Sequence, residues 1–382
     1  MDGKYFDYNA TTPLRPEARA AWLSAVDEYW FNPSSPYRAA ARVHARMQSA
    51  RESMAALLGT SSERIIFNSG ATEGNNAIFA HWAEALPTEA RIGVSPTEHP
   101  SVLEAARHYV GGRIEWLKLD ASGAVDPGAL RELLEKDKQV RAVSVMAANN
   151  ETGILNDWPL IAEICRSKEV HYHCDASQWI GKLPSDGLDQ CDFVTGCAHK
   201  FGGPRGIGFS ILPEVKTSFN LLFGGYQESG HRAGTEDVAG ILAMAAALQA
   251  AEPGTSEGRD AFISELRKQA PMVEIVGGKA GRLWNTVMLV LPEFVNTRWI
   301  RSLEKRGFQV SSGSACSTGK QEPSAVLAAM GLESDTIRRA VRVSSGWTNT
   351  VNDWKRLAGA FAESYDELQA ESKNSTARVI SI

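Results

Sequence analysis

The sequence has no excess of positive charge and no long apolar run, and these two absences exclude whole classes of function. Its 382 residues include 40 Lys and Arg against 45 Asp and Glu, which gives a net charge of -5. Nucleic-acid and membrane-surface binding usually depend on basic clusters, so neither partner is expected. No stretch of about eighteen apolar residues is present to span a bilayer. We therefore expect a soluble protein that acts on a small molecule.

Export signals and paired cysteines are also missing. The opening residues MDGKYFDYNATTP contain neither the basic start nor the apolar core of a signal peptide, so the cytoplasm is the expected compartment. An odd number of cysteines, five, scattered along the chain indicates reduced thiols rather than a disulfide framework. Cys165, Cys174 and Cys191 are interpreted as small buried hydrophobic residues.

The order of apolar segments indicates the fold class. From residue 64 to residue 250, short apolar runs alternate with segments of helical period, which predicts a mainly parallel sheet covered by helices. The stretch AEPGTSEG breaks this pattern and marks a domain boundary. We predict a large domain at 15–250 and a smaller α+β domain made of 1–14 and 251–382. Its final helix is expected from Asn352 to Gln369, followed by a loose tail.

Residues that one cofactor requires follow the expected strands, where open sheets of this kind bind ligands. Lys200 stands between an apolar strand and a turn rich in Gly and Pro, and Asp175 ends another strand. Gly70, Ala71 and Thr72 begin a helix, where free N–H groups suit a phosphate. Taken by itself, Lys200 would be interpreted as a surface lysine on a connecting loop, but it does not stand alone. Lysine, acid and phosphate cradle together indicate pyridoxal phosphate, which needs a Schiff-base lysine, a carboxylate at its ring nitrogen and donors to its phosphate.

The sequence also resembles the cysteine desulfurases of the class V aminotransferase fold, from FDYNATTP near the start to VRVSSGWTNT near residue 350. The matching motifs, in the family's order, are NPSS, SGATEGNN, TEH, ANNETG, DASQ, AHKFGGPRG, HRAGTED and SSGSAC. The resemblance implies an α/β protein, a fold type I PLP-dependent transferase whose large domain has a mainly parallel seven-stranded sheet. It also implies a homodimer that binds pyridoxal 5'-phosphate and converts L-cysteine to L-alanine.

By the same resemblance, each motif residue has an expected role. Lys200 holds the cofactor, Asp175 meets its ring nitrogen and Gln178 meets its ring hydroxyl. His99 stacks on the ring and takes part in catalysis. The expected phosphate ligands are Ala71, Thr72, Cys197, His199 and, from the other subunit, Thr235. Asn150 and Arg342 are expected to bind the substrate, with the guanidinium of Arg342 gripping its carboxylate.

The remaining cysteine, Cys316, lies in the run SSGSACSTG, whose small residues have almost nothing to bury and predict a mobile loop. The resemblance implies that the Cys316 thiolate takes the substrate sulfur as a persulfide while alanine is released. A mobile loop can then carry the sulfur to an acceptor protein. The SSGSAC form is similar to the family's longer-loop group. An iron–sulfur scaffold, a thiolation relay and another sulfur pathway all stay open as acceptors.

Three positions depart from the family's pattern. Cys197 replaces the usual serine, and because a thiol is a weak donor, we expect weaker retention of the phosphate. Ala147 stands where the family commonly has a histidine, which removes one contact near the cleft. Little chain follows the last expected helix, where relatives bind an iron–sulfur scaffold, which counts against that scaffold among the acceptors that stay open.

Alternative functions stay open on the sequence alone. A selenocysteine lyase needs the same lysine and thiol, an aminotransferase needs only the lysine, and a catalytically silent binding module needs neither. A metal site at His171 and His173, which share one strand face, is not expected, because no CxxC or HExxH spacing accompanies them.

Overall fold

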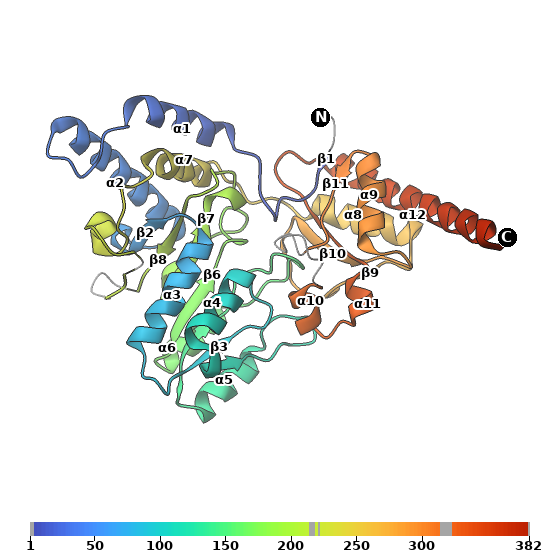
Figure 1. Cartoon of the computed structure of the whole chain (residues 1–382), viewed down its shortest axis with the longest axis horizontal. Helices are drawn as coiled ribbons and strands as arrows, with labels where there is room; N and C mark the ends of the chain where they lie inside the picture. The colour runs from blue at the N-terminus through green and yellow to red at the C-terminus, as the bar shows by residue number, and fades with distance from the viewer. Residues whose placement is uncertain (1–3, 214–217, 221, 314–322, 381–382) are drawn as a thin grey trace.

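The computed structural model describes residues 4–213, 218–220, 222–313 and 323–380. Figure 1 shows two bodies, a larger one that carries the first part of the chain and a smaller one that carries the C-terminal part and the N-terminus. The chain passes between them twice, after strand β1 (Lys4–Tyr5) and after helix α7 (Val238–Gln249). The boundaries given above, 15–250 against 1–14 with 251–382, stay a prediction.

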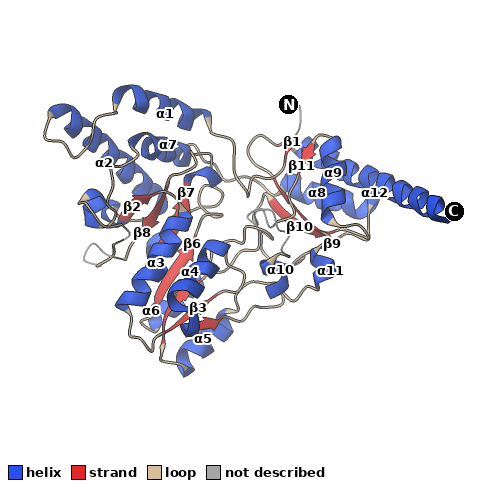
Figure 2. Ribbon diagram, viewed as in Figure 1, coloured by secondary structure: helices blue, strands red, loops and turns tan. Residues whose placement is uncertain are grey.

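A seven-stranded sheet forms the centre of the larger body (Figure 2). In spatial order its strands are β2 (Ile65–Asn68), β8 (Gly208–Ile211), β7 (Phe193–Cys197), β6 (His171–Asp175), β5 (Val140–Ser144), β3 (Arg91–Val94) and β4 (Ile114–Trp116). Strands β7, β6, β5, β3 and β4 are parallel, and β8 is antiparallel to both of its neighbours. The predicted mainly parallel seven-stranded sheet, and with it the fold class, is confirmed.

Helices cover both faces of this sheet, which explains why the residues of its central strands β8, β7 and β6 are almost all buried. The helices of the larger body are α1 (Pro16–Glu28), α2 (Arg38–Leu58), α3 (Ala71–Ala85), α4 (Pro100–Val110), α5 (Pro127–Lys136), α6 (Trp158–Ser167) and α7. Successive strand residues point to opposite faces. Ile66 packs with α3 and α4, whereas Phe67 packs with α2, α6 and α7.

The smaller body has its own apolar core. Its antiparallel sheet has the order β12 (Ala340–Ser344), β10 (Thr286–Val290) and β9 (Glu274–Ile275). Its helices are α8 (Glu257–Gln269), α9 (Asn296–Lys305), α10 (Ala325–Ala329), α11 (Ser334–Ile337) and α12 (Val351–Ile380). Strand β1 pairs in parallel with β11 (Phe308–Gln309), which ties the N-terminal segment to this body.

The last helix corrects one expectation. Instead of ending at Gln369 before a loose tail, α12 continues to Ile380 and extends away from the smaller body (Figure 1). No Gly or Pro interrupts the sequence after Gln369, and an ion pair of 2.9 Å joins Glu371 to Arg298 on α9. Among the described helices, none has both the length and the apolar character needed to cross a membrane.

Candidate active site

A cavity of about 460 Å³ opens at the carboxyl ends of β2, β6 and β7. This is the position that a mainly parallel sheet offers to a ligand, because the loops after successive strands converge there. Nine of the twelve residues assigned to the site from the sequence line the cavity: Ala71, Thr72, His99, Asn150, Asp175, Gln178, Cys197, His199 and Lys200. The fold therefore brings most of the expected site together.

Lys200 ends the short 3-10 turn Ala198–Lys200 that follows β7. Its Nζ donates hydrogen bonds to the backbone oxygens of Asn9, at 2.7 Å, and Ala10, at 2.9 Å. These acceptors belong to the N-terminal segment that crosses between the two bodies. The amine is therefore held at the cavity wall by chain from outside the sheet.

Asp175, at the end of β6, is buried and held by two donors. Its Oδ2 accepts from Asn75 Nδ2 at 2.9 Å, and its Oδ1 accepts from Ser177 N at 3.0 Å. The neighbouring Glu98 is fully buried, and burial first, and then the charge of Asp175, raise its pKa well above the usual value. Asp175 is thus the carboxylate suited to face a cationic ring nitrogen.

Two histidines at the cavity are neutral. His99 caps α4, and its Nδ1 accepts from Ser101 N at 3.1 Å, which leaves the ring proton on Nε2. Burial is the main cause that lowers the pKa of His99, and Lys200 adds to it. Burial, followed by the nearby charge of Lys200, lowers the pKa of His199 to about 3. Neither ring therefore brings a buried positive charge to the site.

The start of α3 forms a cradle of backbone donors. Gly70 has a φ of +144°, a conformation that glycine adopts readily, and a Cβ there would meet nothing within 4 Å. The N–H groups of the first helical turn have no partner within the helix and attract negative charge. The Ala71 N–H donates toward the thiol of Cys197, whose pKa is raised by burial. Arg205 lines the same cavity and adds a cation that the sequence analysis did not assign.

Gln178 and Asn150 present amides to the cavity. Gln178 Nε2 donates to Asn9 O at 3.0 Å, and its Oε1 accepts from Lys182. The side-chain oxygen of Asn150 is buried without a hydrogen-bond partner, whereas its backbone oxygen accepts from Arg342 Nη1 at 3.0 Å. An unpaired buried acceptor costs stability and indicates a position that a ligand completes.

Arg342 lies behind Asn150 and does not line the cavity wall. It is almost fully buried on β12, its Nη2 pairs with Asp7 at 2.5 Å, and its Nε has no hydrogen-bond partner. Its Nη1 also donates to Gly313 O at 3.3 Å, at the base of the loop that leads to Cys316. Cys316 itself lies outside the described residues. The loop base is thus joined to the cavity through Arg342 and Asn150.

Thr235 lies apart from these residues within one chain. It lines a separate cavity of about 180 Å³, which shares Ser69 and Gly206 with the cavity of Lys200. The expected origin of this ligand in a second subunit is compatible with that position. It stays a prediction, because one chain is described.

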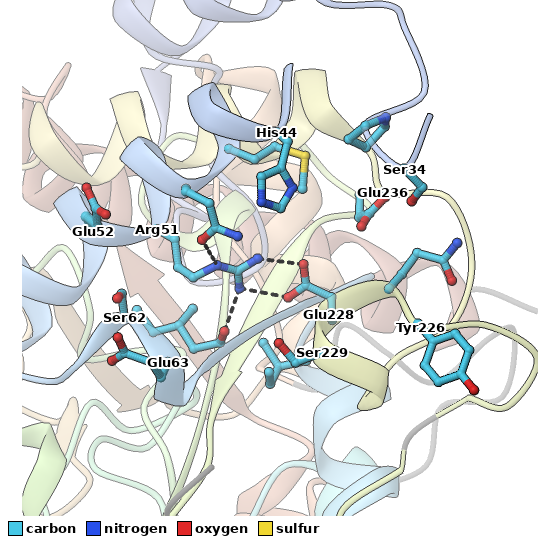
Figure 3. A pocket seen from close by; sticks show the side chains of 16 residues that line it. Ser34, His44, Arg51, Glu52, Ser62, Glu63, Tyr226, Glu228, Ser229 and Glu236 are labelled. Atoms are coloured by element: carbon cyan, nitrogen blue, oxygen red, sulfur yellow. Dashed lines mark hydrogen bonds and ion pairs between the residues drawn. The ribbon is translucent and has the colours of Figure 1, made fainter. Parts of the chain in front are cut away.

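A third and larger cavity, of about 680 Å³, lies between α2 and the turn Gln227–Gly230 (Figure 3). Arg51 and Glu228 form a buried double hydrogen bond at its floor, with distances of 2.6 and 2.8 Å. Glu228 also accepts from Phe67 N at 2.8 Å. Its backbone has a φ of +50°, which is unusual for a residue other than glycine. The ion pair therefore holds a strained turn against β2, seven residues before Thr235.

The two histidines considered for a metal have different environments. His171 is exposed, whereas His173 is buried with hydrogen-bond partners at both ring nitrogens, Ser144 at 2.9 Å and Thr195 at 3.2 Å. Burial lowers the pKa of His173 to about 4. Within the described part of the chain, no cluster of three or more metal-ligating side chains occurs.

The residues around the cavity of Lys200 fit pyridoxal phosphate. A lysine amine, a hydrogen-bonded carboxylate and a cradle of N–H groups are three distinct requirements of this cofactor, and all three line one space. Arg205 supplies positive charge for the phosphate, and the unpaired Asn150 oxygen remains available to a bound molecule.

Comparisons with known proteins agree with this chemistry. The family model "Aminotransferase class-V" matches residues 4–357. The chain is 35% identical over 362 residues to the cysteine desulfurase IscS of Dictyoglomus turgidum, with 91% of each chain covered. It is 34% identical over 365 residues to an IscS-like cysteine desulfurase of Mycobacterium tuberculosis, covering 91% of this chain and 93% of that one.

Solved structures show the same relationship. A NifS-like protein superposes with a TM-score of 0.85 and 29% identity, covering 94% of this chain and 98% of that chain. A NifS-like protein of Rickettsia africae gives a TM-score of 0.81 at 29% identity, with 95% and 99% covered. Sequence, fold and site thus agree, and the chain belongs to the class-V aminotransferase family of pyridoxal-phosphate enzymes.

Proposed function

We propose that this protein is a cysteine desulfurase, which converts L-cysteine to L-alanine and keeps the sulfur on its own thiol. The observation that carries the proposal is that the cofactor cavity is connected to the base of the loop that contains Cys316. Lys200, Asp175 and the start of α3 line one cavity, and the base of the Cys316 loop reaches that cavity through Arg342 and Asn150. The curated relatives at 35% and 34% identity are cysteine desulfurases.

Bound pyridoxal phosphate supplies an electron sink for negative charge that develops at the α-carbon of the amino acid. The residues of this chain orient the cofactor and the substrate around that chemistry. Lys200 would provide the amine that links to the cofactor, and the Asp175 carboxylate would hold the proton on its ring nitrogen. Gln178 would supply an N–H to the ring hydroxyl. Because the His99 ring is neutral, it can stack on the ring face without adding charge to the cavity.

The phosphate is assigned to a second group of residues. These are the residues Ala71, Thr72, Cys197 and His199, with Thr235 from a second subunit and the cation Arg205. The helix start contributes backbone N–H groups and the favourable end of its dipole. His199 is held by Thr11, at 3.2 Å between Nδ1 and Oγ1, which orients its other nitrogen.

The substrate carboxylate is assigned to Arg342 and Asn150. Arg342 has an unpaired Nε but shares its Nη2 with Asp7. A planar guanidinium can bind a carboxylate through Nε while its other side keeps the ion pair. Asn150, whose backbone oxygen accepts from Arg342, would donate its side-chain N–H to the same carboxylate.

Cys316 is assigned the sulfur transfer. Its thiolate attacks the substrate sulfur, so that an S–S bond forms while the C–S bond breaks. The bonding pair stays on the carbon fragment, which takes up protons and leaves as alanine. The four described cysteines are buried, and burial raises the pKa of Cys165 to about 12, so none of these thiols replaces Cys316 in our proposal.

A homodimer forms part of the proposal. Exposed aromatic residues gather near the NPSS motif and near the turn at Glu228: Trp30 is 69% exposed, Phe223 83% and Tyr226 96%. Large exposed apolar groups of this kind usually mark an interface, and two-fold pairing is the commonest assembly. A second copy on this face would cover them and bring in its Thr235. A light-scattering mass of one chain for a fully active sample would refute this part.

Delivery of the sulfur to a protein acceptor in the cytoplasm completes the proposal. The acceptor belongs to iron–sulfur cluster biogenesis or to a thiolation relay. The name IscS of the relatives supports the first of these. Incubation of the persulfide form with candidate acceptor proteins, followed by mass analysis of the acceptor, distinguishes the two.

Lys200→Ala tests the cofactor assignment most directly. The wild-type protein should show a visible absorbance band that borohydride removes, with the reduced cofactor fixed on the Lys200 peptide. The variant should lack this covalent link. A reducible link in Lys200→Ala would assign the cofactor to another lysine. Alanine formed from selenocysteine but not from L-cysteine would favour the lyase. Formation of 3-mercaptopyruvate from L-cysteine, with a keto acid aminated in exchange, would favour the aminotransferase.

A further inference from the structure

A second lysine is buried beside the site and has no role in the chemistry described above. Lys182 is 4% exposed, in the turn that follows β6. Its Nζ donates to Asn9 Oδ1 at 2.8 Å and to Gln178 Oε1. Trp284 Nε1 donates to its backbone oxygen at 3.0 Å, which fixes the turn. Asn9 thus accepts hydrogen bonds from both lysines, from Lys182 through its side-chain oxygen and from Lys200 through its backbone oxygen.

Keeping an amine in this position is costly. Burial is the main cause that lowers the pKa of Lys182 well below its usual value, and the charges of Lys200 and Arg342 add to it, while Cys197 acts in the opposite direction. Among the described residues, no carboxylate forms a salt bridge with Lys182. A side chain that served only to fill space would be apolar, because burying an amine needs compensating acceptors. One of the two acceptors, Gln178, lines the cavity, and the other, Asn9, accepts from Lys200 through its backbone oxygen.

The hydrogen bonds of Lys182 determine how Gln178 is oriented. The Nζ of Lys182 donates in both hydrogen bonds, and the Gln178 atom that faces it is the oxygen Oε1. The Nε2 group is then turned the other way and donates to Asn9 O at 3.0 Å. Gln178 is one of the residues that line the cavity. With a hydrogen-bond donor missing at Lys182, the amide could turn over and present its oxygen to the cavity.

We propose that Lys182 is a positioning residue, which fixes the amide of Gln178 so that an N–H, and not an oxygen, faces the ring hydroxyl of the cofactor. This inference rests on the cofactor site proposed above but does not depend on desulfuration. A donor at the ring oxygen draws its negative charge away from the neighbouring nitrogen that joins Lys200 to the cofactor. Lys182 therefore makes that nitrogen easier to deprotonate.

The measurement is a pH titration of the visible absorbance of the holoenzyme without substrate. In Lys182→Met, which keeps the volume of the side chain, the midpoint should rise by about one pH unit, since an ordinary perturbation by one neighbour is of that order. In a Gln178→Ala background, the same substitution should produce no further rise. An unchanged midpoint in Lys182→Met, or an equal rise without Gln178, would overturn the proposal.

A second variant covers the case in which Lys182→Met does not fold. Gln178→Glu gives Lys182 an anionic partner at the same position and leaves no N–H for the cavity. It should fold with unchanged or higher thermal stability, and its absorbance midpoint should rise. An unchanged midpoint in Gln178→Glu contradicts the role given to Gln178 and, with it, that of Lys182. A protein with no absorbance band at all would instead refute the cofactor site.

Discussion

The buried Arg342 forms an ion pair with the partly buried Asp7, with 2.5 Å between Nη2 and Oδ1, that joins β12 to the N-terminal segment. The same guanidinium binds the backbone oxygens of Asn150 and Gly313. It therefore links three segments that are distant in sequence: the loop after β5, the base of the Cys316 loop and the N-terminus. A substrate carboxylate that binds at the unpaired Nε would therefore contact a side chain that is hydrogen-bonded to all three segments.

Replacement of this guanidinium tests its role in substrate binding. Arg342→Lys keeps the charge that faces Asp7 but removes the planar fork, so the KM for L-cysteine should rise by about tenfold to a hundredfold, the value of one charged hydrogen bond. The value of kcat should change less. Arg338→Lys, at an exposed arginine on the same run, is the matched control and should leave KM unchanged. A wild-type KM in Arg342→Lys would remove Arg342 from the substrate site.

Cys197 provides a test of cofactor retention. Its buried thiol receives the Ala71 N–H at the helix start, and burial raises its pKa, so it stays a neutral thiol. A hydroxyl is a stronger donor than a thiol. Cys197→Ser should therefore tighten cofactor binding by about 1 kcal/mol, the net value of an ordinary hydrogen bond. Equilibrium dialysis of the cofactor against wild type and variant measures this. Equal or weaker binding by the variant contradicts the expectation.

The ion pair between Arg51 and Glu228 should stabilise the turn that leads to Thr235. Arg51→Met leaves a buried carboxylate without its cation, which costs about 3–5 kcal/mol of unfolding free energy. Adding Glu228→Gln removes that charge and should restore part of the loss. Glu52→Gln, an exposed change beside the same cavity, serves as the control. Denaturant unfolding gives all four values, and a double variant as unstable as Arg51→Met would show that the charge is not the cause.

The sequence could predict residues whose role follows from their place after a strand. Lys200, Asp175 and Thr72 line one cavity because the carboxyl ends of their strands meet at one edge of the sheet. Motif resemblance added residues such as Gln178 and Asn150, which a strand pattern alone does not distinguish.

Other features depend on tertiary contacts that no local pattern reveals. Asn9 acts through its backbone oxygen as much as through its side chain, and the partner of Arg342 lies 335 positions away. Lys182 looks like an ordinary turn lysine until its burial is known. The residues after Gln369 include Asn, Ser and Thr, which are weak helix formers, so the sequence predicts an earlier end than the Ile380 at which α12 ends.

The most decisive prediction concerns Cys316, which lies outside the described residues. Cys316→Ala should keep the cofactor spectrum and the spectral change on adding L-cysteine, because these depend on the residues around Lys200. Alanine production should fall by roughly a thousandfold or more, as when other enzymes lose a covalent nucleophile. In the wild-type protein incubated with L-cysteine, peptide mass spectrometry should find one added sulfur on the Cys316 peptide. The controls are Cys165→Ala and Cys191→Ala, two thiols whose pKa is raised by burial, and both variants should keep alanine production. A persulfide on any of the four buried cysteines, or near-normal alanine release from Cys316→Ala, would refute the sulfur-transfer step and leave the cofactor site intact.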